Sequence, residues 1–269
     1  MSESPGKLLR RHGLRPKKSW GQNFLGDEKV LGVLAALSGA GPGDWIVELG
    51  AGLGHLTRAL LATGARVVAV ERDRELAPIL RQELVGAEVH EADAKSFDLG
   101  AVAARAGRPI VLCGNLPYHL SSPILFHALD QRASIRRAVL LLQREVAERV
   151  AAPPGGRDYG LLSVLLGLWA DARIGLSVPR GSFTPPPEVE SAALVLDFLS
   201  APRAQVGDEA RFRALVKAAF AQRRKTLSNA LKVLPGAREA LERAGIDSQR
   251  RGETLTVEEF AAVERGLPR

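Results

Sequence analysis

Cysteine is almost absent from this sequence: Cys113 is the single cysteine among 269 residues. One thiol cannot form a disulfide within the chain or a cysteine-rich zinc site, which favours a reducing compartment. Because Cys113 lies in an apolar run, we interpret it as a small core residue and not as a nucleophile. No metal site is predicted.

Long hydrophobic runs are also missing. No stretch approaches the roughly 20 apolar residues of a membrane span, and the first residues lack the apolar core of a signal peptide. No internal repeat or coiled-coil heptad pattern stands out. We therefore expect a cytoplasmic protein that does not enter a membrane, and we expect a monomer.

Hydrophobic residues make up 46% of the chain and charged residues 25%, as in ordinary soluble proteins. The net charge of +7 is unevenly distributed. Residues 1–20 hold six Lys or Arg against one Glu, and residues 200–269 hold fourteen against nine acids. The middle of the chain holds seventeen against twenty. Basic ends around a near-neutral body favour a polyanionic partner over an ordinary solvated surface.

Between residues 45 and 196, short apolar runs alternate with helical patterns, which predicts an α/β fold with a doubly wound, mostly parallel sheet. A helix capped by Asp27 comes first. The predicted strands are 45–49, 66–70, 87–90, 110–114, 137–142, 172–176 and 192–196. The predicted helices of this part are 55–62, 75–84, 122–129, 145–150 and 159–168, and short amphipathic helices follow at 208–221, 226–234, 237–244 and 257–267.

Three segments follow from this pattern. Residues 1–20 are polar and basic, and we expect a flexible N-terminal arm that ends in an ordered lip. Residues 21–199 form the α/β domain. The composition changes after residue 200, so residues 200–269 are predicted to form a separate helical domain.

A glycine-rich loop closes the first predicted strand, with Gly50, Gly52 and Gly54 at alternate positions. Glycine permits positive φ and close backbone approach, and the following helix exposes unpaired N–H groups, so a nucleotide-like ligand would fit. The dinucleotide fingerprint needs its third glycine one residue later. The spacing therefore favours S-adenosylmethionine over a nicotinamide cofactor.

Acidic residues end two further strands. Glu71 could accept hydrogen bonds from both hydroxyls of a ribose, and Asp93 is placed to meet an adenine amine. Each could instead be a solvated loop carboxylate, but open α/β sheets bind ligands at this edge. Glu48 has two open interpretations: it orients the methionine end of a cofactor, or it accepts N–H bonds from the glycine loop.

The run of residues 111–118 stops abruptly at Asn115, Leu116, Pro117 and Tyr118. Asn115 offers one acceptor and two donors, Leu116 offers a carbonyl, and Pro117 restricts both its own φ and Leu116. With the flat ring of Tyr118, this set suits a planar amine. A strand that merely ends in a turn would have a similar composition.

Together with the sequence 22-QNFL-25 and the segment 183-FTPPPEVES-191, these motifs closely resemble the ribosomal RNA adenine-N6,N6-dimethyltransferases. The resemblance runs from about Lys17 to the C-terminal helices, and residues 219–231 resemble the branch that acts on small-subunit rRNA. It implies a Rossmann-like, seven-stranded S-adenosylmethionine methyltransferase sheet with a small all-helical C-terminal domain. The implied activity is dimethylation of adjacent adenosines in 16S rRNA of the small ribosomal subunit during ribosome biogenesis.

The resemblance also implies roles for individual residues. Asn115 and the Leu116 carbonyl would orient the target amine, while Tyr118 and Phe183 would stack on a base that has left its helix. No strong general base is required, and we interpret His119 as a bystander. The implied cofactor residues are Asn23, Leu25, Gly50, Gly52, Glu71, Asp93 and Asn115. The candidate phosphate contacts are Lys17, Lys18, Arg223, Arg224 and Lys225.

Three alternatives remain. The sister branch of the family methylates large-subunit rRNA and confers antibiotic resistance, and it shares the Phe/Pro motif. A ribosome-assembly or transcription factor could retain the fold without catalysis. A nicotinamide dehydrogenase would bind NADH in place of S-adenosylmethionine.

Overall fold

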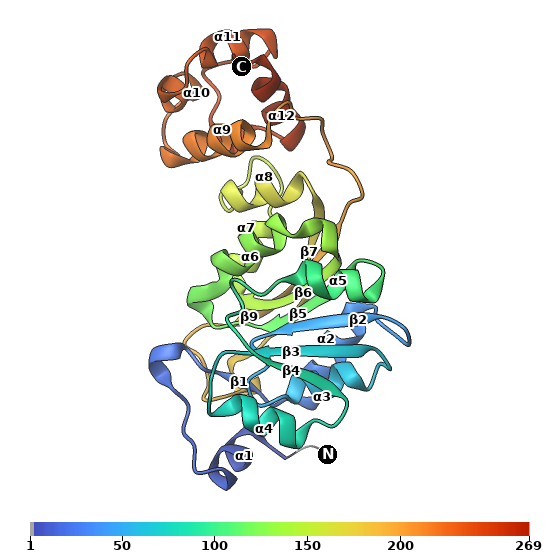
Figure 1. Ribbon diagram of the computed structural model, residues 1–269. Helices are drawn as coiled ribbons and strands as arrows, with labels where there is room; N and C mark the ends of the chain where they lie inside the picture. Colours follow the sequence, from blue (N-terminus) through green and yellow to red (C-terminus); the bar gives the residue numbers. More distant parts are fainter. Residues whose placement is uncertain (1–2, 269) are drawn as a thin grey trace. The chain divides into compact units, whose positions relative to one another are not determined.

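Seven strands form one sheet in the order β4-β3-β2-β5-β6-β9-β7 in the computed structural model, which describes residues 3–268 apart from the side chain of Lys18 (Figure 1). The pairs from β4 to β6 are parallel, and β9 is antiparallel to β6. The predicted α/β class and the seven predicted strands are confirmed. The strands are β2 (Trp45–Leu49), β3 (Arg66–Glu71), β4 (Ala87–Glu91), β5 (Ile110–Asn115), β6 (Ile135–Gln143), β7 (Ala170–Val178) and β9 (Ser191–Phe198).

Contacts divide the chain into two units. The first unit comprises Met1–Ala147 and Arg173–Phe198, and the second comprises Glu148–Ala172 and Leu199–Arg269. The first unit contains most of the sheet and the helices α1 (Pro5–Arg11), α2 (Glu28–Ser38), α3 (His55–Leu61), α4 (Leu76–Glu83), α5 (Leu99–Ala106), α6 (Ser121–Asp130) and the start of α7 (Arg144–Ala151). Within residues 3–268, no helix combines the length and apolar character needed to cross a membrane.

The central strands are continuous apolar runs because both faces of the sheet are covered. Ile46, Val68 and Leu112, one from each of β2, β3 and β5, are at most 1% exposed. Cys113 is buried beside them, and burial raises the pKa of its thiol, in agreement with its interpretation as a core residue. The polar side chains of these strands are therefore concentrated at their carboxyl ends.

Helix boundaries follow from local capping. The Asp27 carboxylate accepts hydrogen bonds from the N–H groups of Lys29 and Val30 at the start of α2, as predicted. Helix α5 was not predicted, although Asp98 caps it through the Ala101 N–H. Only Leu99 and Val102 of α5 are buried, so its apolar pattern is too short to show a helical period.

The prediction of a flexible N-terminal arm is wrong for the part of it that forms a helix. Residues Pro5–Arg11 form α1, whose Leu8 and Leu9 are at most 4% exposed and pack with Phe24, Leu53 and Leu76. Two adjacent leucines give a short helix enough apolar surface to dock, at about 1.5–3 kcal/mol for each fully buried side chain.

A two-stranded ribbon brings distant segments together. Strand β1 (Phe24–Leu25) pairs antiparallel with β8 (Phe183–Thr184), with Leu25 opposite Phe183. Neither strand was predicted, because two residues are too few to show an alternating pattern. The ribbon places the segment 22-QNFL-25 beside the start of the proline-rich segment.

The second unit is built from helices, and it includes a segment that we had assigned to the α/β domain. Residues Glu148–Ala172 belong with Leu199–Arg269, so the predicted domain 21–199 is too long in this part. The reason is α8 (Leu161–Gly167), whose apolar residues are buried by packing against α9 and α12. The other helices of this unit are α9 (Glu209–Ala221), α10 (Leu227–Ala230), α11 (Ala237–Arg243) and α12 (Val257–Gly266).

Candidate active site

One pocket of about 320 Å³ lies at the carboxyl ends of β2, β3, β4 and β5. This is the edge at which open α/β sheets bind ligands. The structure brings together all the residues predicted to contact the cofactor or the target base. The pocket is lined by Asn23, Leu25, Gly50, Gly52, Glu71, Asp93, Asn115, Leu116, Pro117, Tyr118 and Phe183, among others.

The glycine loop forms the floor of the pocket between β2 and α3. Gly50 and Gly52 have φ values of 73° and 57°, a region that side chains rarely adopt. A Cβ on Gly52 would also come within 3.2 Å of the Phe24 ring. The loop therefore exposes backbone to the pocket, and any larger residue at Gly52 would move either the loop or Phe24.

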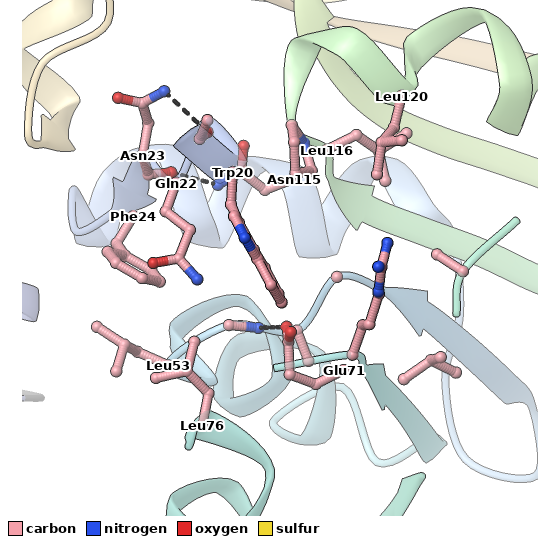
Figure 2. Close-up of a pocket in the computed structure, with 18 of the residues that line it drawn as sticks. Trp20, Gln22, Asn23, Phe24, Leu53, Glu71, Leu76, Asn115, Leu116 and Leu120 are labelled. Atoms are coloured by element: carbon pink, nitrogen blue, oxygen red, sulfur yellow. Dashed lines mark hydrogen bonds between the residues drawn. The ribbon is translucent and has the colours of Figure 1, made fainter. Parts of the chain in front are cut away.

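Glu71 ends β3 and is 8% exposed. One of its carboxylate oxygens accepts the Gly52 N–H at 2.8 Å (Figure 2), and the other accepts the Asp73 N–H at 2.7 Å. Burial raises the pKa of Glu71, and these N–H groups act against the rise. Each carboxylate oxygen has a second lone pair, so Glu71 is held rigidly and can still accept from a ligand hydroxyl.

Asp93 follows β4 and is not a freely solvated loop carboxylate. Its Oδ1 accepts the Lys95 N–H at 3.0 Å, and the Arg72 guanidinium lies 3.5 Å from its Oδ2. Arg72 also lies over the ring of Trp20, with 5.3 Å from Cζ to the ring centroid. Arg72 therefore connects Asp93 to the N-terminal segment at this end of the pocket.

Glu48 is the most deeply buried acid of the pocket, at 1% exposure, and its Oε2 atom has no hydrogen-bond partner within the described part of the chain. Burial raises the pKa of Glu48 to about 8, and the nearby Glu71 carboxylate adds to the rise. The loop N–H groups of Gly50 and Gly52 donate to Val70 O and to Glu71. This arrangement favours the interpretation in which Glu48 orients the methionine end of a cofactor.

Asn115 ends β5 and is held by the N-terminal segment. Its Nδ2 donates to the Asn23 carbonyl at 3.0 Å. Because a carbonyl can only accept, the NH₂ group of the amide must face Asn23, and the Oδ1 atom is the group left to accept from a ligand. Leu116 is buried, and its N–H donates to Leu141 O.

The two aromatic residues predicted to stack on the base come from separate segments of the chain, Tyr118 after β5 and Phe183 in β8. Tyr118 follows Pro117, and its hydroxyl forms a hydrogen bond of 2.9 Å with the Ser191 hydroxyl at the start of β9. Burial raises the pKa of Tyr118. Phe183 is 4% exposed in β8, where Leu25 is its partner, and the peptide bond that follows Thr184 is cis. Both residues line the same pocket.

Three residues of the site were missed from the sequence. Trp20 lines the pocket and is directed toward Glu71 (Figure 2). Asp73 is 2% exposed and accepts the Gln22 Nε2 at 2.9 Å. Gln22 lies within a quoted motif, and Asp73 stands two residues after Glu71, but no spacing in the sequence shows that these side chains meet.

The residues predicted to contact phosphates differ in whether their side chains already bind other groups of the protein. Lys17 forms ion pairs with Asp73 at 2.7 Å and Glu75 at 2.5 Å, and these hydrogen bonds raise the pKa of Lys17. Arg223 donates to the carbonyls of Arg157 and Tyr159. Arg224 and Lys225 are exposed between α9 and α10, and the side chain of Lys18 lies outside the described part of the chain.

Comparison with known proteins gives one family. Residues 13–267 match the family described as "Ribosomal RNA adenine dimethylase". Proteins named ribosomal RNA small subunit methyltransferase A are 57% identical in Anaeromyxobacter dehalogenans strain 2CP-C, over 98% of both chains, and 55% identical in Myxococcus xanthus, over 98% of this chain and 95% of that protein. The crystal structure of the 23S rRNA methyltransferase ErmE has a TM-score of 0.71 at 26% identity, covering 91% of this chain and 99% of ErmE.

Proposed function

The chain belongs to the ribosomal RNA adenine dimethylase family, and we propose from this premise that it transfers two methyl groups from S-adenosylmethionine to the N6 amine of adenosines in 16S rRNA. The observation that carries the proposal is the convergence of Glu71, Asp93, Asn115 and Tyr118 on one pocket. The 55–57% identity to small-subunit methyltransferases, against 26% to ErmE, favours the small subunit as the substrate. The protein would act as a monomer in the cytoplasm.

The pocket fits S-adenosylmethionine by the chemistry of its groups. Gly50 and Gly52 leave room for close backbone approach, and Glu48 Oε2, which has no partner among the described residues, offers a buried acceptor to an ammonium group. Glu71 would accept from the ribose hydroxyls and Asp93 from the adenine amine, while Asn23 and Leu25 would cover the cofactor. When bound, S-adenosylmethionine supplies an electrophilic methyl group.

Asn115 and Leu116 would orient the target amine. The exocyclic nitrogen of adenine is a poor nucleophile, because its lone pair is delocalised into the ring. The Asn115 Oδ1 atom and the Leu116 carbonyl would accept its two N–H groups, which turns the lone pair out of the ring plane. The contribution of these residues is orientation and electrostatic stabilisation of the charge that develops on nitrogen.

Tyr118 and Phe183 would hold the base after it leaves its stack. Base–aromatic stacking contributes on the order of 1–3 kcal/mol per base, which offsets a few kcal/mol of unstacking. The Tyr118–Ser191 hydrogen bond fixes the tyrosine ring, and the pairing of Phe183 with Leu25 fixes the other wall. The methylated N6 amine loses a proton to water only after methyl transfer, so none of these residues has to act as a strong base.

Basic side chains of the helical unit would contact RNA phosphates. Arg224 and Lys225 are exposed and adjacent in sequence, so their side chains can approach the RNA backbone. Phosphate contacts position an RNA without reading its bases. Lys17 is the weakest of the predicted contacts, because its charge is already paired with Asp73.

The test is methyl transfer to isolated ribosomal subunits. Purified protein is incubated with methyl-labelled S-adenosylmethionine and with small or large subunits that lack adenine methylation, and nucleosides are separated after digestion. The proposal predicts labelled N6,N6-dimethyladenosine in small-subunit rRNA. Label confined to large subunits would assign the protein to the activity named for ErmE, and the absence of label in both would overturn the proposal.

A further inference from the structure

The N-terminal lip, residues 17–25, joins the two functional ends of the pocket. Lys17 and Gln22 of the lip contact Asp73, which stands two residues beyond the proposed ribose acceptor Glu71. Asn23 of the lip contacts Asn115, the proposed acceptor of the target amine. The hydrogen bonds that form this link join three segments of the chain: the lip, Asp73 and Asn115.

Asp73 is the anchor of the lip. Lys17 Nζ donates to both carboxylate oxygens at 2.7 and 2.8 Å, and Gln22 Nε2 donates to Oδ2 at 2.9 Å. Burial alone would raise the pKa of Asp73, but the hydrogen bonds from Lys17, the Glu75 N–H and Gln22 hold its pKa below the ordinary value. A buried carboxylate with this many donors is fixed in position and stays ionised.

Gln22 connects Asp73 to the backbone of the lip. Its Oε1 accepts the Lys17 backbone N–H at 2.8 Å, while its Nε2 is bound by Asp73. Both ends of the Gln22 amide are therefore used, and the backbone between Lys17 and Gln22 is closed into a loop on Asp73. The next residue is Asn23, and β1 begins directly after it.

The Asn23 carbonyl connects the lip to Asn115, the proposed acceptor of the target amine. It accepts Asn115 Nδ2 at 3.0 Å, as Figure 2 shows, and thereby decides which way the Asn115 amide faces. If this carbonyl moved, the amide could rotate and present NH₂ to the target amine in place of oxygen. A displacement of about 1 Å at a reacting group can cost on the order of 100-fold in rate.

We propose that Asp73 is a positioning residue: by holding Lys17 and Gln22 it fixes the lip, and the Asn23 carbonyl of the lip sets the orientation of the Asn115 amide. The inference rests on the function proposed above for Asn115. Asp73 also has a local structural role at the start of α4, where its Oδ1 accepts the Glu75 N–H at 3.1 Å. The positioning role is additional to this one.

Asp73→Asn separates the two roles of the residue. An asparagine keeps the oxygen that accepts the Glu75 N–H, but it loses the charge that binds Lys17 and the second oxygen that binds Gln22. The primary readout is the side-chain NH₂ signal of Asn115 in a nitrogen–proton NMR spectrum, identified by its loss in Asn115→Ala. The indole N–H signals of Trp45 and Trp169 report whether each unit is folded.

In Asp73→Asn the Asn115 signal is expected to shift or broaden, while the Trp45 and Trp169 signals stay in place. The kcat for methyl transfer is expected to fall on the order of 10-fold. Glu75→Gln is the matched control, because Glu75 pairs with Lys17 at 2.5 Å but makes no contact with Gln22 among the described hydrogen bonds. The Asn115 signal should remain unchanged in this control.

An unmoved Asn115 signal in folded Asp73→Asn would overturn the inference, and so would an equal shift in Glu75→Gln. If Asp73→Asn fails to fold, Gln22→Ala decides, because it breaks the same link without touching α4. The NMR measurement needs no RNA. A failure of the proposed function, seen as no methyl transfer by the unaltered protein, therefore remains distinguishable from a failure of this inference.

Discussion

The pocket at the sheet edge and the basic surface of the helical unit use polar residues in opposite ways. In the pocket, Glu48 and Glu71 are at most 8% exposed, and backbone N–H groups fix the Glu71 carboxylate. In the helical unit, Arg224 and Lys225 are exposed on a turn. Rigid buried groups can orient a reaction, whereas exposed charges contribute attraction that salt screens. Chemistry and docking are therefore assigned to different regions.

The largest effect is expected from Asn115→Ala. The variant removes the acceptor of the target amine, so kcat should fall by about 100- to 1,000-fold, as when one stabilising hydrogen-bond group is removed from other active sites. Cofactor affinity, measured by calorimetry, should change far less. A retained kcat would place the chemistry at another residue and would contradict the role assigned to Asn115.

Glu71→Gln should weaken cofactor binding without comparable harm to folding. Hydrogen bonds to charged groups contribute about 1.5–3 kcal/mol, so the Kd for S-adenosylmethionine should rise roughly 10- to 100-fold. Glu75→Gln serves as the control, because Glu75 is an exposed acid that does not line the pocket at the sheet edge. Equal affinity in both variants would contradict the assignment of Glu71 to the cofactor.

Glu48 should make the protein less stable as the pH rises. Its ordinary pKa is 4.5 and its pKa in the fold is about 8, so between these values the unfolded chain releases a proton that the folded chain keeps. Stability therefore falls by up to about 1.4 kcal/mol per pH unit in this window and levels off above pH 8. In urea unfolding at pH 6 and pH 8.5, Glu48→Gln should lack this part of the decline. An identical pH dependence in variant and parent would show that Glu48 is already ionised.

Replacing Arg224 and Lys225 together by alanine should weaken binding to ribosomal subunits several-fold. Each lost phosphate contact should lower the slope of log affinity against log salt by about 1. Filter binding at several salt concentrations measures both quantities. An unchanged salt slope would mean that these side chains do not contact RNA phosphates.

The smallest effect is expected from His119→Ala. His119 is an exposed residue that lines the pocket next to Tyr118, and no general base is needed once the proton leaves after methyl transfer. The single-turnover rate should stay within about twofold of the parent between about pH 5 and pH 8. A large loss that changes with pH in this window would show that His119 takes up the proton.

The sequence predicted the parts of the molecule that depend on local pattern. The seven strands, the glycine loop and the acids at strand ends follow from apolar runs and their terminating residues. The ribbon of Phe24 with Thr184, the docking of α1 and the anchoring of Gln22 by Asp73 were not predictable. These features depend on contacts between residues 51 to 160 positions apart or on apolar pairs too short to show a period.

The account assigns catalysis to the pocket and RNA docking to the helical unit. Single-turnover methyl transfer at increasing concentrations of small subunits tests this assignment most directly. The account predicts that the Arg224→Ala, Lys225→Ala variant reaches the rate of the parent at saturation, whereas Asn115→Ala remains at least about 100-fold slower at every concentration. A surface variant that stays slow at saturation, or an Asn115→Ala variant that recovers there, would contradict it.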